Sequence, residues 1–252
     1  MNKRIVFTIA DEGDMKYATK MVNSLRKFHS EEDLEVLVIT GDDLKSRLQR
    51  DPMFFYRATP VIAKELWAKG YREIIKIDAD SVITSDISHL WKETIKAGAN
   101  VGVVNNGNPR ETKKYPVSVW NIHPYSYVNA GLVVMTDERF INHWLNLCFS
   151  VHFDYYQMKE QDLLNIMVFY MDFKVMFLDA GKKWHGLISK GYWPQCELID
   201  DKLILPKNEE YPANEDKEIC VIHFAGGRMP DKMNFDLFFK EDVSKWLKKL
   251  TK

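Results

Sequence analysis

The first half of the chain alternates short apolar runs with segments of helical periodicity, and this alternation most constrains the fold. The apolar runs over 5–10, 34–40 and 74–78 have the length of buried strands. Between them, apolar residues recur at the spacing of amphipathic helices over 15–28 and 61–67, the second of which precedes a Gly suited to a helix end. Such alternation predicts an α/β fold with a mixed, mostly parallel sheet, helices on both faces, and ligands bound beyond the carboxyl ends of the strands.

The second half continues the pattern less regularly, and no linker separates it from the first. We therefore expect a single domain over 1–252, with a nucleotide-binding half over 1–104 and a second half over 105–252. The segment 105–127 is rich in Asn, Pro, Gly and aromatic residues and is expected to be a functional loop. The remaining predicted elements are strands at 101–104, 132–136, 174–178 and 219–224, helices at 137–150 and 160–172, and a C-terminal helix within 235–250.

Composition removes several classes of function. The 35 basic and 36 acidic residues are mixed along the chain and give no electrostatic footprint for nucleic acid. The apolar run at 5–10 is cut short by acidic residues, so we expect no signal peptide and a cytoplasmic protein. The three cysteines lack the spacing of a zinc finger and are predicted to be small buried apolar residues, with neither a disulfide framework nor a structural zinc site. They are Cys148, Cys196 and Cys220.

One acidic motif carries the strongest chemical signal. The strand at 74–78 runs directly into Asp78-Ala79-Asp80, where two carboxylates stand two residues apart and can project to one side of an extended chain. Carboxylate oxygens suit Mg²⁺ or Mn²⁺, which proteins commonly bind together with the phosphates of a substrate. The motif therefore predicts a site for a metal and phosphates, although a solvated strand end that binds nothing could have the same sequence.

Four segments together resemble glycosyltransferase family 8. They lie in the family's order and span most of the chain, and the fold implied is the A-type glycosyltransferase fold. The last segment has Met229 where the family has Lys before its Pro. The segments are YREIIKIDADSVITSD (Tyr71–Asp86), YVNAGLVVM (Tyr127–Met135), EQDLLN (Glu160–Asn165) and VIHFAGGRMP (Val221–Pro230).

The resemblance implies roles for residues around the metal. Asp78, Asp80 and His223 become the ligands of Mn²⁺ or Mg²⁺, and Mn²⁺ accepts imidazole beside carboxylate. Gly226 lacks a Cβ, so its backbone can approach the diphosphate, and Arg228 is expected to replace the missing Lys as a phosphate contact.

The resemblance also implies residues for the nucleotide and the sugar, and it assigns the half over 105–252 to the donor sugar and the acceptor. At the end of the first strand, Thr8, Ala10 and Asp11 are expected at the uridine, with Tyr17 stacking on the uracil. Arg57 is expected to contact the diphosphate or to form a surface pair. Expected donor-sugar contacts are Asn129, Ala130, Glu160, Gln161 and Asp162, of which Asn129, Gln161 and Asp162 are assigned to catalysis.

The predicted activity is Mn²⁺-dependent transfer of a hexosyl group from a UDP-sugar to a hydroxyl acceptor, such as a glycan or lipopolysaccharide, with retention by resemblance. One alternative is a haloacid-dehalogenase-like phosphohydrolase that uses Asp78 as nucleophile. Another is an inactive module that binds nucleotide sugars or glycans. The C-terminal helix is basic and amphipathic, so we weigh a peripheral membrane contact against docking on the core.

Overall fold

The computed structural model describes residues 3–48, 53–105, 122, 126–150, 153, 156–180, 183–186, 193–207, 215–225 and 233–252. Its centre is a six-stranded sheet in the order β2-β1-β3-β6-β5-β7. The pairs β2/β1, β1/β3 and β5/β7 are parallel, whereas β6 runs antiparallel to both of its neighbours. These strands are β1 (Lys3–Ala10), β2 (Glu35–Thr40), β3 (Tyr71–Ile77), β5 (Val101–Asn105), β6 (Val128–Met135) and β7 (Val175–Phe177).

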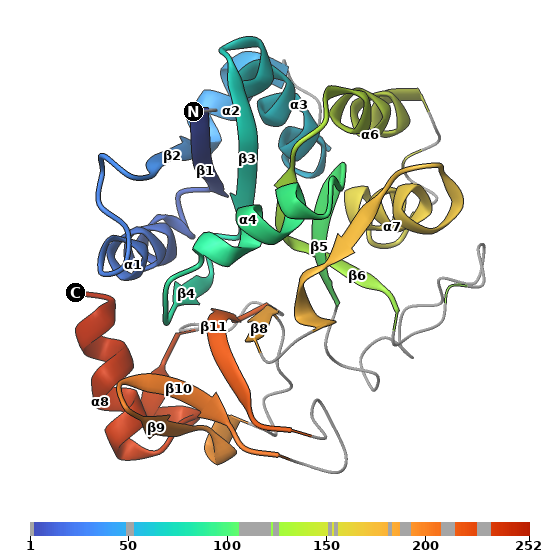
Figure 1. Cartoon of the computed structure of the whole chain (residues 1–252). Helices are drawn as coiled ribbons and strands as arrows, with labels where there is room; N and C mark the ends of the chain where they lie inside the picture. Colours follow the sequence, from blue (N-terminus) through green and yellow to red (C-terminus); the bar gives the residue numbers. More distant parts are fainter. Residues whose placement is uncertain are drawn as a thin grey trace.

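Helices cover both faces of this sheet, as the sequence predicted (Figure 1). Alternate side chains of β1 enter different cores: Ile5 and Phe7 face the core shared with α3, α6 and α7, whereas Val6 faces the core shared with α1 and α4. The period of two along a strand explains this division. The helices are α1 (Met15–Arg26), α2 (Gly41–Leu48), α3 (Phe54–Ala68), α4 (Ser88–Lys96), α6 (Glu138–Ser150), α7 (Glu160–Tyr170) and α8 (Glu241–Leu250).

A second, smaller sheet lies beside the first and joins distant parts of the chain (Figure 1). Its order is β4-β11-β10-β9, and β8 pairs in parallel with β11. Strand β11 is therefore central, and its end pairs antiparallel with β4, placing His223 opposite Ser81. The strands are β4 (Ser81–Ile83), β8 (Lys183–Gly186), β9 (Glu197–Ile199), β10 (Lys202–Leu205) and β11 (Lys217–His223), with short 3-10 turns at Leu178–Ala180, Trp193–Gln195 and Phe235–Leu237.

The predicted elements are present with shifted ends, and several short elements escaped prediction. Gly70, with a φ of 93°, follows α3 as expected of a glycine at a helix end. The sequence analysis did not predict α2, α4, β4, β8, β9 or β10. They lack a long apolar period. Strands β4 and β8 pair with β11, far along the chain, whereas β9 and β10 are short strands of one hairpin.

The C-terminal segment docks on the second sheet. It is a 3-10 turn followed by α8 rather than one continuous helix, and Val243 and Leu247 of α8 are fully buried in a core with residues of β10 and β11. The apolar side of α8 is thus covered, which favours docking over the membrane contact. Across the described ranges, no helix combines the length and the apolar character needed to span a bilayer.

Candidate active site

The three predicted metal ligands meet where the two sheets join. Asp78 and Asp80 occupy the short turn between β3 and β4, and His223 ends β11. The Nε2 atom of His223 lies 3.1 Å from Asp78 Oδ2 and 3.1 Å from Asp80 Oδ1. Backbone bonds fix the turn, since Asp78 N donates to Gly131 O at 2.7 Å and Phe224 N donates to Asp80 O at 2.9 Å. The structure thus brings the three side chains together, and their role as metal ligands stays a prediction.

The electrostatics of this carboxylate cluster (Asp78, Asp80 and His223) match a cation site. Burial alone would lower the pKa of His223, but the Asp80 and Asp78 carboxylates raise it to about 9. Burial also opposes ionisation of Asp78, yet Lys76 and His223 hold the pKa of that carboxyl well below its usual range. The cluster thus concentrates two negative charges that attract a proton onto the imidazole, and a divalent cation could replace that proton.

The surroundings of the cluster also fit a metal. The ligand atoms of its three residues all lie within 4.8 Å of one another. Two carboxylate oxygens and one imidazole nitrogen form a donor set that Mn²⁺ accepts. A Cβ added at Gly131 would lie 2.4 Å from His223 Cε1, so only glycine lets β6 pass this close to the imidazole ring.

Lys76 is a member of the site that the sequence analysis missed. It is 5% exposed, and its Nζ atom donates to Asp78 Oδ1 and, at 2.7 Å, to Ala130 O. Lysine is rarely buried unless it is paired. A single Lys inside the apolar run 74–77 was the available signal, and its two-residue separation from Asp78 predicts that both side chains leave the strand on the same side.

The predicted donor-sugar residues form one buried network between β6 and α7. Gln161 Oε1 accepts from Ala130 N at 2.9 Å and from Asn129 Nδ2 at 3.2 Å. Asp162 accepts from the Tyr127 hydroxyl at 2.7 Å and from Met158 N at 2.9 Å. The amide of Gln161 is therefore oriented by the protein itself, and the Asp162 carboxylate is occupied by protein donors.

Two further buried side chains complete this region. Asn165 is fully buried and exchanges hydrogen bonds with the backbone of Val128 at 2.8 and 2.9 Å, a role that its place in the Glu160–Asn165 motif could have suggested. Burial raises the pKa of Glu160 to about 8, while Lys76 favours its charged form. Glu160 is therefore mostly a neutral carboxylic acid at pH 7.

The residues expected at the uridine differ in their exposure in the structure. Asp11 lines an open cavity of about 580 Å³ at the carboxyl ends of β1 and β2, whereas Thr8 and Ala10 are fully buried. Tyr17 is 3% exposed and packs in the core of the second sheet, so its ring must be uncovered before a base can stack on it. The cavity is lined by Asp11, Glu12, Gly13, Met15, Thr40, Gly41, Asp42, Lys45, Phe54 and Phe55.

Of the residues expected to contact the diphosphate, the structure describes Arg57 but not Gly226 or Arg228. The guanidinium of Arg57 lies over two aromatic rings, 5.2 Å from the centroid of Phe149 and 4.8 Å from that of Phe153. This is a cation–π arrangement, and both roles that the sequence analysis considered for Arg57 stay predictions. Gly226 and Arg228 lie outside the described residues, so their diphosphate roles stay predictions.

Comparison with known proteins identifies the family of this chain. The family model described as glycosyl transferase family 8 matches residues 11–230. No curated protein gives a significant match to the sequence.

Solved structures of glycosyltransferases share the fold at low sequence identity. The galactosyltransferase LgtC, in complex with donor and acceptor sugar analogues, is 12% identical with a TM-score of 0.58, and the match covers 98% of this chain and 95% of LgtC. A glycosyltransferase involved in glycosylation of the major capsid of PBCV-1 is 10% identical with a TM-score of 0.55, over 93% of this chain and 100% of that one.

The chain also matches the apo structure of the bifunctional glycosyltransferase WbbM. That match has 14% identity and a TM-score of 0.60, and it covers 99% of this chain. The chain spans only 52% of the length of WbbM. These likenesses show that the mixed sheet and its helices form an A-type glycosyltransferase fold.

Proposed function

Because the chain belongs to glycosyl transferase family 8, we propose that it moves a hexosyl group from a UDP-sugar to a hydroxyl of a glycan or lipopolysaccharide-like acceptor, with retention of anomeric configuration. The observation that carries this proposal is the carboxylate cluster, whose ligand atoms lie within 4.8 Å of one another beside the network of Asn129 and Gln161. Family membership favours transfer over the phosphohydrolase alternative, which gives His223 no role.

The carboxylate cluster would hold Mn²⁺ or Mg²⁺. When bound, the ion supplies positive charge against the negative charge that develops on the departing diphosphate. The protein contributes order, because Lys76 holds Asp78 and the paired strands β4 and β11 hold His223 opposite Ser81. These contacts place the ligands before substrate arrives, which avoids reorganisation during the reaction.

The donor sugar would lie against the network between β6 and α7. Asn129 Oδ1 accepts from Gly131 N at 2.7 Å, and Gln161 Oε1 holds the opposite end of the Asn129 side chain. In this proposal Asn129 and Gln161 contact the sugar, and Gln161 faces the reacting carbon. Asp162 has a positioning role. It accepts a hydrogen bond from the Tyr127 hydroxyl, and that hydroxyl in turn accepts one from Gln161 Nε2 at 3.3 Å.

The nucleotide would occupy the cavity at the carboxyl ends of β1 and β2, the edge where α/β sheets bind such ligands. Base selection can be measured by thermal unfolding. UDP with Mn²⁺ should raise the melting temperature more than ADP with Mn²⁺, because a ligand stabilises only the state that binds it. Equal shifts for the two nucleotides would rule out the uridine assignment.

The direct test of the activity is a panel of nucleotide sugars assayed for hydrolysis with and without Mn²⁺, in the absence of acceptor. We expect one UDP-hexose to be cleaved faster than the other donors and only with metal. Asp80→Asn serves as the inactive control, since it keeps the size of the side chain and removes its charge. A phosphorylated Asp78 trapped from a phosphate ester, with no cleavage of any UDP-sugar, would replace the transferase with a phosphohydrolase.

A further inference from the structure

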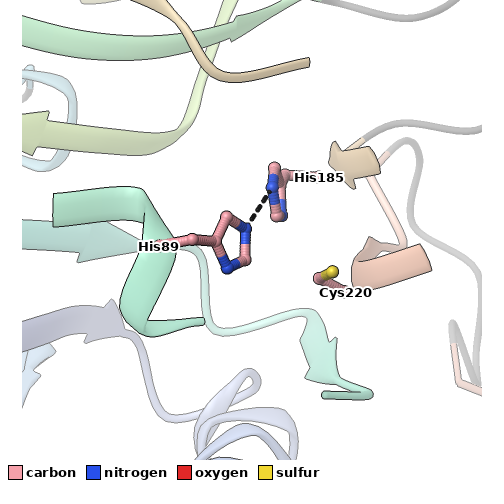
Figure 2. Close-up of side chains that lie close together, drawn as sticks. All are labelled: His89, His185 and Cys220. Carbon is pink, nitrogen blue, oxygen red and sulfur yellow. Dashed lines mark hydrogen bonds between the residues drawn. The ribbon is translucent and has the colours of Figure 1, made fainter. Parts of the chain in front are cut away.

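A second group of metal-ligand side chains lies away from the carboxylate cluster. His89 of α4, His185 of β8 and Cys220 of β11 converge so that their ligand atoms all lie within 4.8 Å of one another (Figure 2). The Nε2 atoms of the two histidines are 2.8 Å apart, and the rings stack with centroids 4.6 Å apart. We call these three residues the histidine–cysteine cluster. Its ligands come from three elements that only the folded chain brings together.

The cluster is built into the interior of the protein. His185 and Cys220 are both fully buried, and His89 is partly buried at the start of α4. The backbone N–H of His185 donates to Asp179 Oδ1 at 2.8 Å, which fixes the position of β8 at this point. His185 Nδ1 is buried and has no hydrogen-bond partner among the described residues.

The chemical state of the ligands suits a borderline-soft cation. Burial lowers the pKa of His89 to about 4, with Lys183 acting in the same direction, and burial lowers the pKa of His185 well below its usual range. Both imidazoles are thus neutral near pH 7 and able to offer lone pairs. The Cys220 thiol makes a weak contact with Glu218 O at 3.8 Å. Burial raises the pKa of this thiol to about 12, so the thiolate forms when a cation displaces the proton. Two imidazole nitrogens and one thiolate are typical ligands of Zn²⁺.

We propose that His89, His185 and Cys220 bind one Zn²⁺ ion and that this ion ties α4, β8 and β11 together, with a water molecule in the fourth tetrahedral position. On binding, the Cys220 proton passes to solvent, and the ring that carried a proton on Nε2 takes it on Nδ1 instead. Zn–N bonds of about 2.0–2.1 Å at a tetrahedral angle place two nitrogens roughly 3.3 Å apart. The two imidazoles therefore separate by about half an ångström from their hydrogen-bonded position.

Lys183 gives the proposal a specific consequence. Its Nζ atom lies 3.4 Å from His89 Nδ1, so its charge opposes a second cation, and it must turn away when His89 Nδ1 carries the proton. Lys183→Met should therefore tighten Zn²⁺ binding, while a purely structural histidine pair would bind no Zn²⁺ in either protein. Removing a ligand should weaken Zn²⁺ binding, so the two kinds of substitution have opposite expected effects on Zn²⁺ affinity.

The site contrasts with the sequence prediction for the cysteines. All three are free and buried in the structure, as predicted. Cys148 and Cys196 lie in apolar cores, which matches their interpretation as small apolar residues. Cys220 also belongs to an apolar core, but the ligand atoms of two histidines lie within 4.8 Å of its sulfur. The ligands stand at 89, 185 and 220, and this spacing matches no local zinc motif, so sequence alone could not predict the site.

The test uses the full chain after removal of metal by a chelator. Titration with Co²⁺ should produce a thiolate-to-cobalt charge-transfer band with about one equivalent of metal, and Zn²⁺ should abolish the band. A chromogenic competitor then gives the Zn²⁺ affinity. We expect Cys220→Ser to lose the band, and His89→Gln to weaken Zn²⁺ binding by roughly tenfold or more. Cys196→Ser and Cys148→Ser are the matched controls and should keep the band.

Asp80→Asn separates this site from the carboxylate cluster, because it should keep the cobalt band while losing metal-dependent turnover. Absence of the band in folded wild-type protein would overturn the proposal, as would a band that persists in Cys220→Ser. If Cys220→Ser fails to fold, His89→Gln and Lys183→Met decide the question through their opposite effects on Zn²⁺ affinity. Unchanged affinity in both variants would also overturn it.

Discussion

Two three-residue clusters share strand β11 but differ in chemistry. The carboxylate cluster uses His223 with two aspartates, and the side chain of Asp78 is 34% exposed. The histidine–cysteine cluster uses Cys220, three residues earlier, with two histidines and no carboxylate. Hard oxygen ligands near the surface suit an ion that is shared with a diphosphate, whereas softer ligands in the interior suit an ion that is held permanently. One strand can thus carry a proposed reaction site and a proposed structural site.

The two clusters also differ in how they balance charge without a metal. Lys76 and the protonated imidazole of His223 lie against the aspartates of the first cluster. The second cluster is neutral, and its two histidines bond to each other. A partly buried pair of carboxylates without counter-charge would be destabilising, whereas a neutral cluster has a smaller desolvation cost. This difference predicts which substitutions each cluster tolerates.

The largest expected effect separates two acidic residues that lie close in sequence. Asp80→Asn removes a predicted metal ligand, while Asp86 lies at the surface and accepts from Ser88 N at 2.6 Å. Losing one preorganised electrostatic contact costs about 2.7–4 kcal/mol, so turnover should fall by on the order of a hundredfold or more in Asp80→Asn. Asp86→Asn should change it little. Steady-state kinetics with Mn²⁺ and the donor found in the panel would check both.

The same assay tests the imidazole ligand. His223→Ala should lose most turnover at limiting Mn²⁺, and excess Mn²⁺ should restore part of it, because two carboxylates and the diphosphate still bind the ion. Rescue of Asp80→Asn should be weaker. Full activity of His223→Ala at limiting Mn²⁺ would falsify the three-ligand site.

A pair of glycine substitutions should separate steric damage at the carboxylate cluster from damage elsewhere in the sheet. In Gly131→Ala the new Cβ would meet His223 Cε1 at 2.4 Å, and in Gly102→Ala it would meet Thr94 Oγ1 at 2.5 Å. Both should destabilise the fold by about 1–3 kcal/mol, as overpacking does. Only Gly131→Ala should also weaken Mn²⁺ binding, because only there does the clash move a ligand. Calorimetric titration of Mn²⁺ into both variants would show the difference, and equal Mn²⁺ affinities would contradict it.

Removing Lys76 should make the metal more important to stability. Lys76→Met keeps the approximate length of the side chain but takes the counter-charge from Asp78 and a donor from Ala130 O. The metal-free protein should lose about 1–3 kcal/mol, since a buried acceptor and a charge lose their partner. The ion then replaces the missing charge, so Mn²⁺ should raise the melting temperature more in Lys76→Met than in wild type. A smaller shift in the variant would mean that Lys76 does not compete with the ion.

The two clusters also show what sequence could and could not predict. The alternating periodicity predicted the parallel units, and the Asp-x-Asp motif together with the family resemblance predicted that His223 joins Asp78 and Asp80. The burial of Tyr17 and the stacking of Arg57 on two phenylalanines depend on packing by residues far away in the chain, which local patterns do not contain. The histidine–cysteine cluster escaped for the same reason, because it requires the parallel pairing of β8 with β11 and the position of α4.

The smallest expected effect concerns the start of α4, an element that carries a ligand of the histidine–cysteine cluster but none of the carboxylate cluster. His29 Nε2 accepts from Ile87 N at 3.2 Å, immediately before α4 begins. Burial lowers the pKa of His29 below 6.5, although Asp86 opposes this shift. The folded protein binds a proton at His29 less tightly than the unfolded chain, whose histidine titrates near pH 6.5. This contribution to stability is therefore present above about pH 6.5 and is lost as the pH falls.

His29→Gln replaces the imidazole with an amide oxygen that can accept from Ile87 N and does not titrate. The free energy of unfolding of the variant should therefore fall less than that of wild type between about pH 8 and about pH 5. The difference should be about 1 kcal/mol or less, the net value of one hydrogen bond. Urea unfolding of both proteins at the two pH values measures it. Mn²⁺ affinity should be the same in both proteins, because His29 supports α4 and contacts no residue of the carboxylate cluster in the described part of the chain. If the free energies of unfolding of the two proteins fall in parallel with pH, the neutral imidazole does not anchor α4.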